Sequence, residues 1–200
     1  MQRYWIVVSV AGVVAAIGLA AGLDEVEGAF GQWRVAGQNL ANTRSAAGEK
    51  QISSSNVGSL AVKWTFTTGG DVSATPTVAG DALYVPDWAG NVYAINRNNG
   101  QQIWSVQVPV LDGVMGAVSR SSPAIHGDDV IIGDIENDGV APPHKGANLI
   151  ALNRKTGKLH WITQVDNQGM AIITGSPVVY GDVVYVGISS NEEIMAIPNS

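Results

Sequence analysis

The sequence contains no cysteine among its 200 residues. That absence excludes disulfides, thiolate zinc sites, cysteine nucleophiles and covalently attached c-type haem from these residues. Charged residues are also scarce, at 14%, and the 11 lysines and arginines are outnumbered by 17 acidic residues. The resulting net charge of −6 argues against a nucleic-acid partner, because phosphate binding requires basic patches.

Motifs for metal binding and for common catalytic chemistry are missing as well. The three histidines, His126, His144 and His160, do not have the spacing of metal ligands. The acidic run from Asp134 to Gly139 alternates oxygen ligands but lacks the other positions of an EF-hand, so we expect a solvated loop there. No P-loop, GxGxxG motif or nucleophile elbow follows a predicted strand.

An uncharged segment near the N-terminus is the clearest feature that is present. Arg3 precedes an apolar run from Tyr4 to Leu23, which ends in small residues and is followed by acidic ones. This order is typical of a secretory signal peptide, and a length of about 20 residues also suits an uncleaved membrane anchor. In either case we expect a signal helix over 1–22, a leading segment over 23–60, and export to the periplasm or the extracellular space.

Three similar segments follow the leading segment. Each has a Ser/Thr-Pro pair, an apolar pair, Gly-Asp and a β-rich run, in the order TPTVAGDALYVPDW from Thr75, SPAIHGDDVIIGDI from Ser122 and SPVVYGDVVYVGIS from Ser176. The Gly-Asp pairs predict tight hairpin turns with positive φ. Between the segments, VYAINRNNGQQIW and LIALNRKTGKLHW each predict a strand, a turn and a further strand that carries tryptophan.

Four short strands in each unit of roughly 50 residues predict the blades of a β-propeller. A single blade cannot bury both of its faces, so we expect each tryptophan to pack against the neighbouring blade. The residues expected to dock the blades are Trp64, Gly100, Trp104, Gly157 and Trp161. The third unit stops at Ser200, so residues 61–200 hold about two and a half blades. An open ring leaves unpaired sheet edges, which favours an N-terminal fragment or truncated product over an independent domain.

The repeat A-[IL]-N-R-x-x-G-x-x-x-W resembles the tryptophan-docking motif of the pyrroloquinoline quinone (PQQ) dehydrogenase propellers. The segment W-R-x-x-G-x-N-x-x-N-T-R over 33–44 resembles the start of the same proteins. DVSATPTVAGDALYVPDWAGNVYAIN, AVSRSSPAI and VGISSNEE most resemble the polyvinyl-alcohol-dehydrogenase-like branch. The resemblance implies an all-β, eight-bladed propeller that holds PQQ and calcium on its axis and oxidises alcohols to carbonyls. Non-catalytic outer-membrane assembly propellers share the repeat motif alone.

The resemblance also implies cofactor contacts for individual residues. Arg120, in AVSRSSP, matches an arginine that contacts the quinone, and a planar guanidinium suits an anionic tricarboxylate such as PQQ. Without that match, Arg120 would be interpreted as a surface residue in a solvated turn. Thr174 and Ser189, with Ser190 beside them, match the hydroxyls that hydrogen-bond the cofactor.

The calcium ligand implied by the resemblance is Glu192, with Glu193 as the alternative in a shifted register. Asn191 is a weaker candidate for an amide contact. Two departures from the family pattern stand beside these matches. Ser73 and Ala74 occupy the place of a glutamate that often contacts the cofactor, and PVLDGVMGAVSR lacks the adjacent cysteine pair of many members.

The sequence therefore predicts the N-terminal part of an exported PQQ- and calcium-dependent alcohol dehydrogenase. Its substrate would be a small or polymeric alcohol, and a cytochrome or quinone would accept the electrons. The catalytic base is expected beyond residue 200, so we expect these 200 residues alone to be inactive. Two alternatives remain open: a non-catalytic scaffold or binding module with the same repeat, and an inactive truncated relative.

Overall fold

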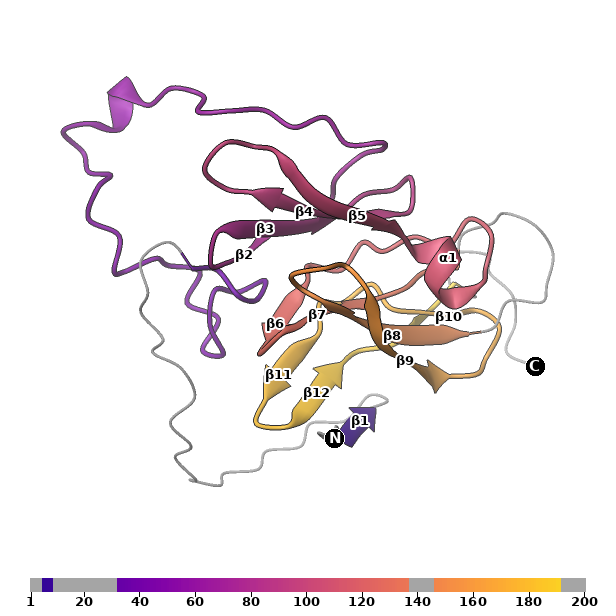
Figure 1. The fold of residues 1–200 in the computed structure, drawn as a ribbon. Helices are drawn as coiled ribbons and strands as arrows, with labels where there is room; N and C mark the ends of the chain where they lie inside the picture. Colours follow the sequence, from indigo (N-terminus) through magenta and orange to yellow (C-terminus); the bar gives the residue numbers. More distant parts are fainter. Residues whose placement is uncertain (1–4, 9–31, 137–145, 192–200) are drawn as a thin grey trace.

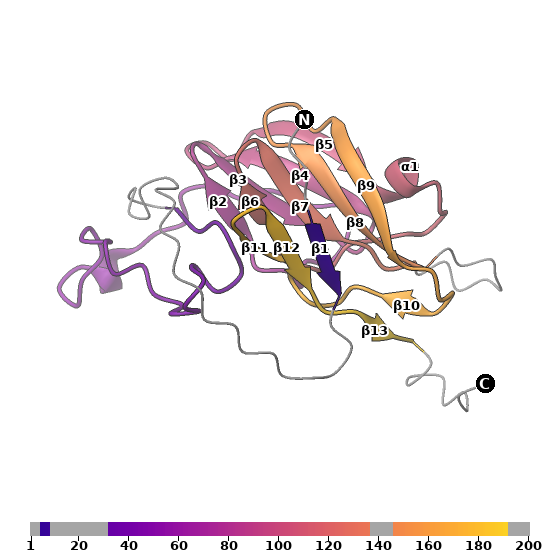
Figure 2. The ribbon, with the colours of Figure 1, turned by 90° about the horizontal axis from the view of Figure 1, so that it is seen from below.

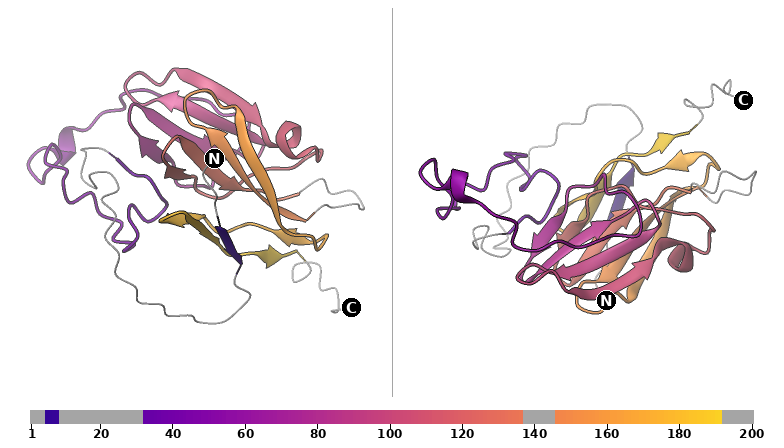
Figure 3. Two further views of the ribbon diagram at one scale, coloured as in Figure 1. Left: turned by 60° about the horizontal axis from the view of Figure 1, so that its bottom comes forward. Right: turned by 90° about the horizontal axis from the view of Figure 1, so that it is seen from above.

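The structure, a computed structural model, describes residues 5–8, 32–136 and 146–191. Its strands form mainly antiparallel sheets that follow one another in chain order (Figure 1). Figures 2 and 3 show these sheets as successive layers, with the long leading segment running outside them. In the described residues, no helix is long and apolar enough to cross a membrane.

The first two repeats each form a four-stranded antiparallel sheet. The first sheet pairs, in order, β2 (Thr77–Ala79), β3 (Ala82–Pro86), β4 (Asn91–Asn96) and β5 (Gln102–Gln107). The second pairs β6 (Ala124–His126), β7 (Asp129–Gly133), β8 (Ala147–Asn153) and β9 (Leu159–Asp166). The predicted strand order of a propeller blade is therefore confirmed in both repeats. A short helix that the sequence did not reveal, α1 (Val108–Asp112), leads from the first sheet to the second.

The third repeat supplies a hairpin of β11 (Val178–Tyr180) and β12 (Val183–Val186). Before and after it, β10 (Ala171–Ile172) pairs with β13 (Ser189–Ser190). The third strand predicted for this repeat, within IMAIPNS, lies outside the described residues. The all-β, incomplete propeller expected from the sequence is thus what the described residues form, while the total of eight blades stays a prediction.

The hairpin turns follow the predicted Gly-Asp pairs. Ala79 pairs with Ala82 across Gly80-Asp81, and Gly80 has a φ of 61°. Positive φ at the first central residue alone is the arrangement of a type II′ turn, whose twist matches that of the strands it joins. Gly127 and Gly181 stand at the same place in the other two hairpins, with φ of 53° and 56°.

The N-terminal segment differs from the sequence expectation where the structure describes it. A signal helix was expected over 1–22, but Trp5–Val8 forms a strand, β1, which pairs parallel with β12. The run Trp-Ile-Val-Val is rich in aromatic and β-branched residues, which favour strands. The free edge of β12 also offers unpaired N–H and C=O groups to any adjacent strand. In the leading segment, η1 (Val57–Ser59) is a single 3-10 turn, and Trp33 bridges to Val78 of β2.

The hydrophobic core lies between the sheets. One buried cluster joins the first sheet to the second, and another joins the second sheet to the third repeat. Consecutive residues of β7 serve both clusters, because Ile132 belongs to the first and Ile131 to the second. A sheet buried on both faces needs apolar side chains at every position, which explains the unbroken apolar runs of β7 and β8.

Candidate functional site

The N-R-x-x-G turn forms a docking surface at one end of each blade. Gly100 donates its N–H to Asn96 O at 2.8 Å, and Gly157 does the same to Asn153 O at 2.8 Å. Both glycines have positive φ, 74° and 70°. The two turns share this geometry, and the side chain of Asn153 also caps its turn, which explains why the sequence repeats asparagine and glycine at these offsets.

A tryptophan from the preceding repeat lies on each of these glycines. Trp64 covers Gly100, and a Cβ atom built on that glycine would approach the indole Cδ2 to 2.8 Å. Trp104 covers Gly157 at the same separation of 2.8 Å. Each indole N–H donates to an arginine carbonyl in the docked turn, Trp64 to Arg97 O at 2.9 Å and Trp104 to Arg154 O at 2.9 Å.

Two further aromatic residues, Tyr84 and Trp161, contribute to packing between the repeats. Tyr84 adds an O–H bond to Arg154 O at 3.1 Å and packs against Trp104 with ring centroids 5.9 Å apart. Trp161 is half-buried against the second core cluster. The turn on which Trp161 would dock belongs to the third repeat and lies outside the described residues.

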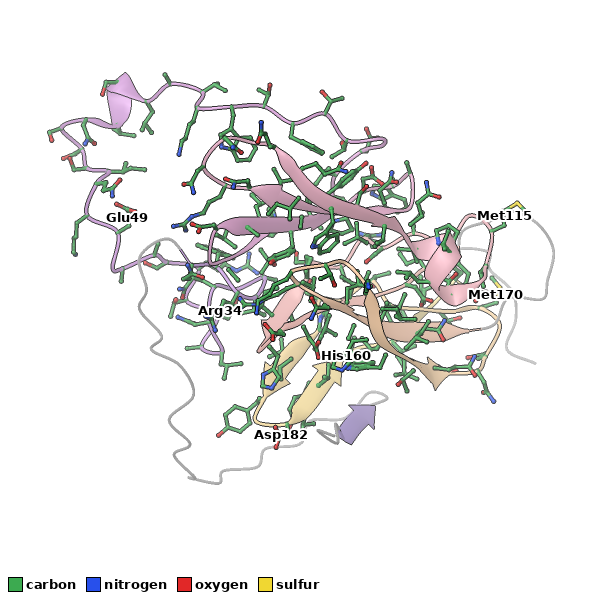
Figure 4. The ribbon with its side chains drawn as sticks, in the orientation of Figure 1. Arg34, Glu49, Met115, His160, Met170 and Asp182 are labelled. Carbon is green, nitrogen blue, oxygen red and sulfur yellow. The ribbon has the colours of Figure 1, made fainter. Side chains whose placement is uncertain are left out.

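At the opposite end of the blades, the Ser/Thr-Pro pairs connect the three repeats. Thr75 donates its N–H to Ser122 Oγ at 2.8 Å, and Ser122 donates its N–H to Ser176 Oγ at 3.0 Å. The residues joined are 47 and 54 positions apart, the spacings of the repeat itself. Thr77 adds a buried bond from its Oγ1 to Pro123 O at 2.6 Å. Equivalent residues of successive blades are therefore adjacent at this end, which is marked on the right of Figure 4 by Met115 and Met170.

Arg120 stands at this end on a firmly held backbone. Ser119 and Ser121 are both buried, and they bond to Gly133 O at 2.6 Å and to Gly133 N at 3.0 Å. Because successive side chains of an extended segment alternate in direction, these inward serines leave Arg120 exposed. Its guanidinium carbon lies 5.6 Å from the ring centroid of Trp88, and it makes no hydrogen bond or ion pair with a described residue.

Thr174 and Ser189 are brought together in the third repeat. Their hydroxyl oxygens are 3.2 Å apart, across the β10–β13 pair. Ile173, fully buried, lies against Gly133 and donates its N–H to Asp134 O at 3.0 Å, which fixes the neighbouring Thr174. Ser190 lies in β13 and pairs with Ala171.

The rest of the predicted metal site is only partly described. Asn191 donates its N–H to Met170 O at 2.9 Å, so its backbone is held beside β10. Glu192 and Glu193, the candidate calcium ligands, lie outside the described residues. Within 5–8, 32–136 and 146–191, no three His, Asp or Glu side chains are grouped closely enough to hold a metal ion.

The repeat places the candidate residues at equivalent positions. Arg120 precedes Ser122 by two residues, as Thr174 precedes Ser176 and Ser73 precedes Thr75. In the first repeat, Ser73 Oγ accepts a bond from Trp88 Nε1 at 2.9 Å. Ser73 and Trp88 are 15 residues apart, and so are Thr174 and Ser189. The first and third repeats therefore present a side-chain pair at the same place.

Trp88 and the two buried serines are the residues that sequence reasoning missed at this end. Two signals could have identified them. The shared spacing of 15 residues relates Trp88 to Ser189. The alternation in Ser119-Arg120-Ser121 separates two anchoring positions from one outward position.

Two buried aspartates close equivalent hairpins in the first two repeats. Asp87 accepts bonds from Asn91 N at 2.8 Å, Tyr93 Oη at 3.0 Å and the Gly70 amide at 3.1 Å. Burial alone would raise the pKa of Asp87, but its hydrogen bonds from Asn91, Tyr93 and Gly70 outweigh burial and lower that pKa.

Asp134 has the same place in the second repeat and the opposite shift. It accepts bonds from Asn148 N and Nδ2, both at 2.6 Å. Burial raises the pKa of Asp134 to about 7, and the charges of Asp112 and Glu136 add to the rise. Fewer donors and two nearby carboxylates therefore distinguish this carboxyl from Asp87.

His160 has a structural position. Its Nδ1 lies 2.8 Å from Asp129 Oδ1, a contact between β9 and β7. This contact joins two strands of the second sheet, which gives His160 a structural role.

Four-stranded sheets docked by tryptophan on glycine define a partial β-propeller of the tryptophan-docking type. The family profile described as "Outer membrane protein assembly factor BamB", a PQQ-like repeat profile, matches residues 10–200. The chain therefore belongs to the PQQ-like β-propeller repeat family.

Individual relatives include dehydrogenases. A polyvinylalcohol dehydrogenase of a Pseudomonas species is 30% identical over 165 residues, which cover 82% of this chain and 24% of that protein. A lanthanide-dependent methanol dehydrogenase of Methylacidiphilum fumariolicum is 30% identical over 198 residues, 90% of this chain and 30% of that protein. The structure of a quinohemoprotein alcohol dehydrogenase from Comamonas testosteroni matches with a TM-score of 0.66 and 28% identity, over 84% of this chain and 25% of that one. The chain thus spans 24% to 30% of the length of these curated relatives.

Proposed function

We propose that this chain forms the N-terminal blades of an exported, PQQ-dependent alcohol dehydrogenase that also requires a metal ion. The relatives named above are dehydrogenases of methanol, polyvinylalcohol and other alcohols, which supports this class of reaction. The observation that carries the proposal is that Arg120 has a fixed backbone and, among the described residues, an unoccupied guanidinium. Its backbone is clamped by two buried serines, while its guanidinium has no hydrogen-bond acceptor among the described residues.

The residues at this end of the blades fit an anionic quinone. An arginine with free in-plane donors suits carboxylate groups, and the Thr174 and Ser189 hydroxyls offer donors and acceptors to carbonyl oxygens. PQQ, when bound, would supply the two-electron redox chemistry of alcohol oxidation. The role of this chain's own residues would be to bind the cofactor and fix its orientation. The proton of the alcohol would be taken by a base outside these 200 residues.

For the metal ion we propose calcium, with Glu192 as a ligand and Glu193 as the alternative. A carboxylate is a hard oxygen ligand, which calcium prefers. Because one relative is named as lanthanide-dependent, a trivalent lanthanide is the alternative metal. Both ions require the same kind of ligand, so the two are separated by reconstitution with each metal in turn.

A non-catalytic scaffold is the second candidate. The matching family profile carries the description of an outer-membrane assembly factor, and Ser73 and Ala74 stand where the resemblance to the dehydrogenases implies a glutamate. A scaffold would need the docking tryptophans and glycines but would not need Arg120 to be held ready for an anion.

The test is reconstitution of the intact gene product with PQQ and either Ca²⁺ or La³⁺. We expect a change in quinone absorbance on binding, and reduction of an artificial dye when a primary alcohol is added. Arg120→Gln should weaken PQQ binding by about 10- to 100-fold, the usual range for loss of a charge-assisted hydrogen bond. Lys158→Gln removes the same charge at the opposite end of the blade and should leave binding unchanged. Absence of both signals with either metal would leave the scaffold as the better account.

A further inference from the structure

Trp88 is an exposed tryptophan whose position the docking of blades does not require. It lies in the turn between β3 and β4, and 37% of its surface is exposed. The tryptophans of the docking motif, in contrast, lie at the other end of the blades on Gly100 and Gly157. Trp88 therefore needs a different explanation.

The turn that carries Trp88 is rigid. Asp87, almost fully buried, accepts bonds from Ala89 N at 3.0 Å and Asn91 N at 2.8 Å. Trp88 itself donates its backbone N–H to Asp71 O at 2.9 Å. The indole is then fixed by the bond from its Nε1 to Ser73 Oγ at 2.9 Å. Both the backbone and the ring plane of Trp88 are held by its own repeat.

The fixed ring faces the arginine of the next repeat. The Arg120 guanidinium carbon lies 5.6 Å from the indole centroid, within the range of a cation–π contact. A guanidinium that stacks on an aromatic face keeps its in-plane N–H donors available. Stacking therefore restricts the long side chain of Arg120 without using the donors that an anion would need.

The internal repeat supports a role in the site for this pair. Ser73 and Trp88 occupy the positions of Thr174 and Ser189, and each pair is joined by a hydrogen bond over 15 residues. Ser73, with Ala74, stands where the resemblance to the PQQ dehydrogenases implies a cofactor-contacting glutamate. Its bond to Trp88 shows that the position is used in this chain, although with a neutral hydroxyl.

We propose that Trp88, fixed by Ser73, is a positioning residue that holds the Arg120 guanidinium ready for the carboxylate or carbonyl oxygens of a bound quinone. This proposal rests on the function proposed above. Holding the side chain in one conformation before binding reduces the entropy lost when the anion is bound. The affinity for the anion therefore depends on the ring as well as on the arginine.

The experiment measures the PQQ affinity of the intact gene product in the presence of its metal, for the wild type and five variants. Trp88→Leu should weaken binding between about 2- and 30-fold, the range of a cation–π contact. Trp88→Phe retains an aromatic face and should recover part of that loss. Arg120→Gln and the double variant complete a double-mutant cycle. The fold-losses in affinity of the two single variants should not multiply in the double variant, because Trp88 acts through Arg120. A second measurement needs no cofactor: the Arg120 Nε–Hε resonance should shift when Trp88→Leu removes the ring current.

Each result decides a separate point. If the wild type binds PQQ and Trp88→Leu binds it equally well, the positioning role is overturned and the proposed function stands. The same conclusion follows if the losses in affinity multiply in the double variant. An Arg120 resonance that Trp88→Leu does not move also overturns it. If the wild type binds no PQQ with either metal, the proposed function fails and the positioning role falls with it. Trp33→Phe, a matched change in the leading segment, should leave both the affinity and the resonance unaltered.

Discussion

Replacing Gly157 by alanine should destabilise the protein more than the same replacement at Gly80. Both glycines have positive φ, 70° and 61°, so alanine is strained at either site. That strain is worth about 1–2 kcal/mol for an L-residue in the left-handed region. The two sites differ in their surroundings, because a Cβ at Gly80 would meet nothing within 4 Å, whereas one at Gly157 would lie 2.8 Å from the Trp104 ring.

The additional cost at Gly157 follows from that contact. Trp104 is only 8% exposed and is hydrogen-bonded to Arg154, so it cannot move aside freely. Forcing extra volume into a packed site costs about 1–3 kcal/mol. Gly157→Ala should therefore lower the free energy of unfolding by about 2–5 kcal/mol, against about 1–2 kcal/mol for Gly80→Ala.

Urea unfolding followed by tryptophan fluorescence and by circular dichroism measures both changes. A third variant, Trp104→Leu combined with Gly157→Ala, removes the ring that the new methyl group meets. Its cost should be smaller than the sum of the two single changes, since they affect one contact. Equal destabilisation by Gly157→Ala and Gly80→Ala, within about 0.5 kcal/mol, would show that the glycine serves the turn alone and refute docking as its reason.

Three further changes test other contacts. Asp134 has a pKa of about 7 against an ordinary 3.8, so the folded state keeps a proton that the unfolded state releases between these values. Stability should therefore fall as pH rises from about 4 to about 7, by up to about 4 kcal/mol, and Asp134→Asn should flatten this slope in pH-dependent urea titrations. Asp87 has a lowered pKa, so its contribution is present above its unfolded pKa and is lost as pH falls through the folded one. Asp87→Asn should cost about 1–3 kcal/mol at pH 7, and a stabilising effect there would contradict the hydrogen-bond account. Ser122→Ala removes the acceptor of the Thr75 N–H and should lower the free energy of unfolding by about 1–3 kcal/mol, while the exposed Ser59→Ala should change it by less than about 0.5 kcal/mol.

The features that the sequence predicted are those set by neighbouring residues. Gly80-Asp81 specifies a two-residue turn, and the apolar runs on either side specify paired strands of matching length. The Asn and Gly of N-R-x-x-G form hydrogen bonds within one turn. The repeated turn could therefore be predicted without knowledge of the tryptophan that packs on it. Local chemistry was sufficient in these cases.

The features that were missed depend on contacts between residues that are far apart in the sequence. In the sequence alone, nothing distinguishes Trp88 from the other aromatic residues. Only the fold shows that it contacts Arg120 and Ser73. Ser119 and Ser121 are common turn residues by composition, and only their bonds to Gly133 show them to be anchors. The parallel pairing of β1 with β12 joins residues about 178 positions apart in register, Trp5 with Val183, which no local pattern encodes.

Four bonds that join successive repeats run in the same direction, from a donor in one repeat to an acceptor in the next. Trp64 and Trp104 donate to carbonyls of the following repeat, and the Thr75 and Ser122 amides donate to hydroxyls of the following repeat. Such a head-to-tail contact uses two different surfaces of one unit, so every unit carries both halves of it. A unit copied in tandem by gene duplication would therefore arrive with its complete interface. The number of blades in such an array can change without the evolution of any new contact.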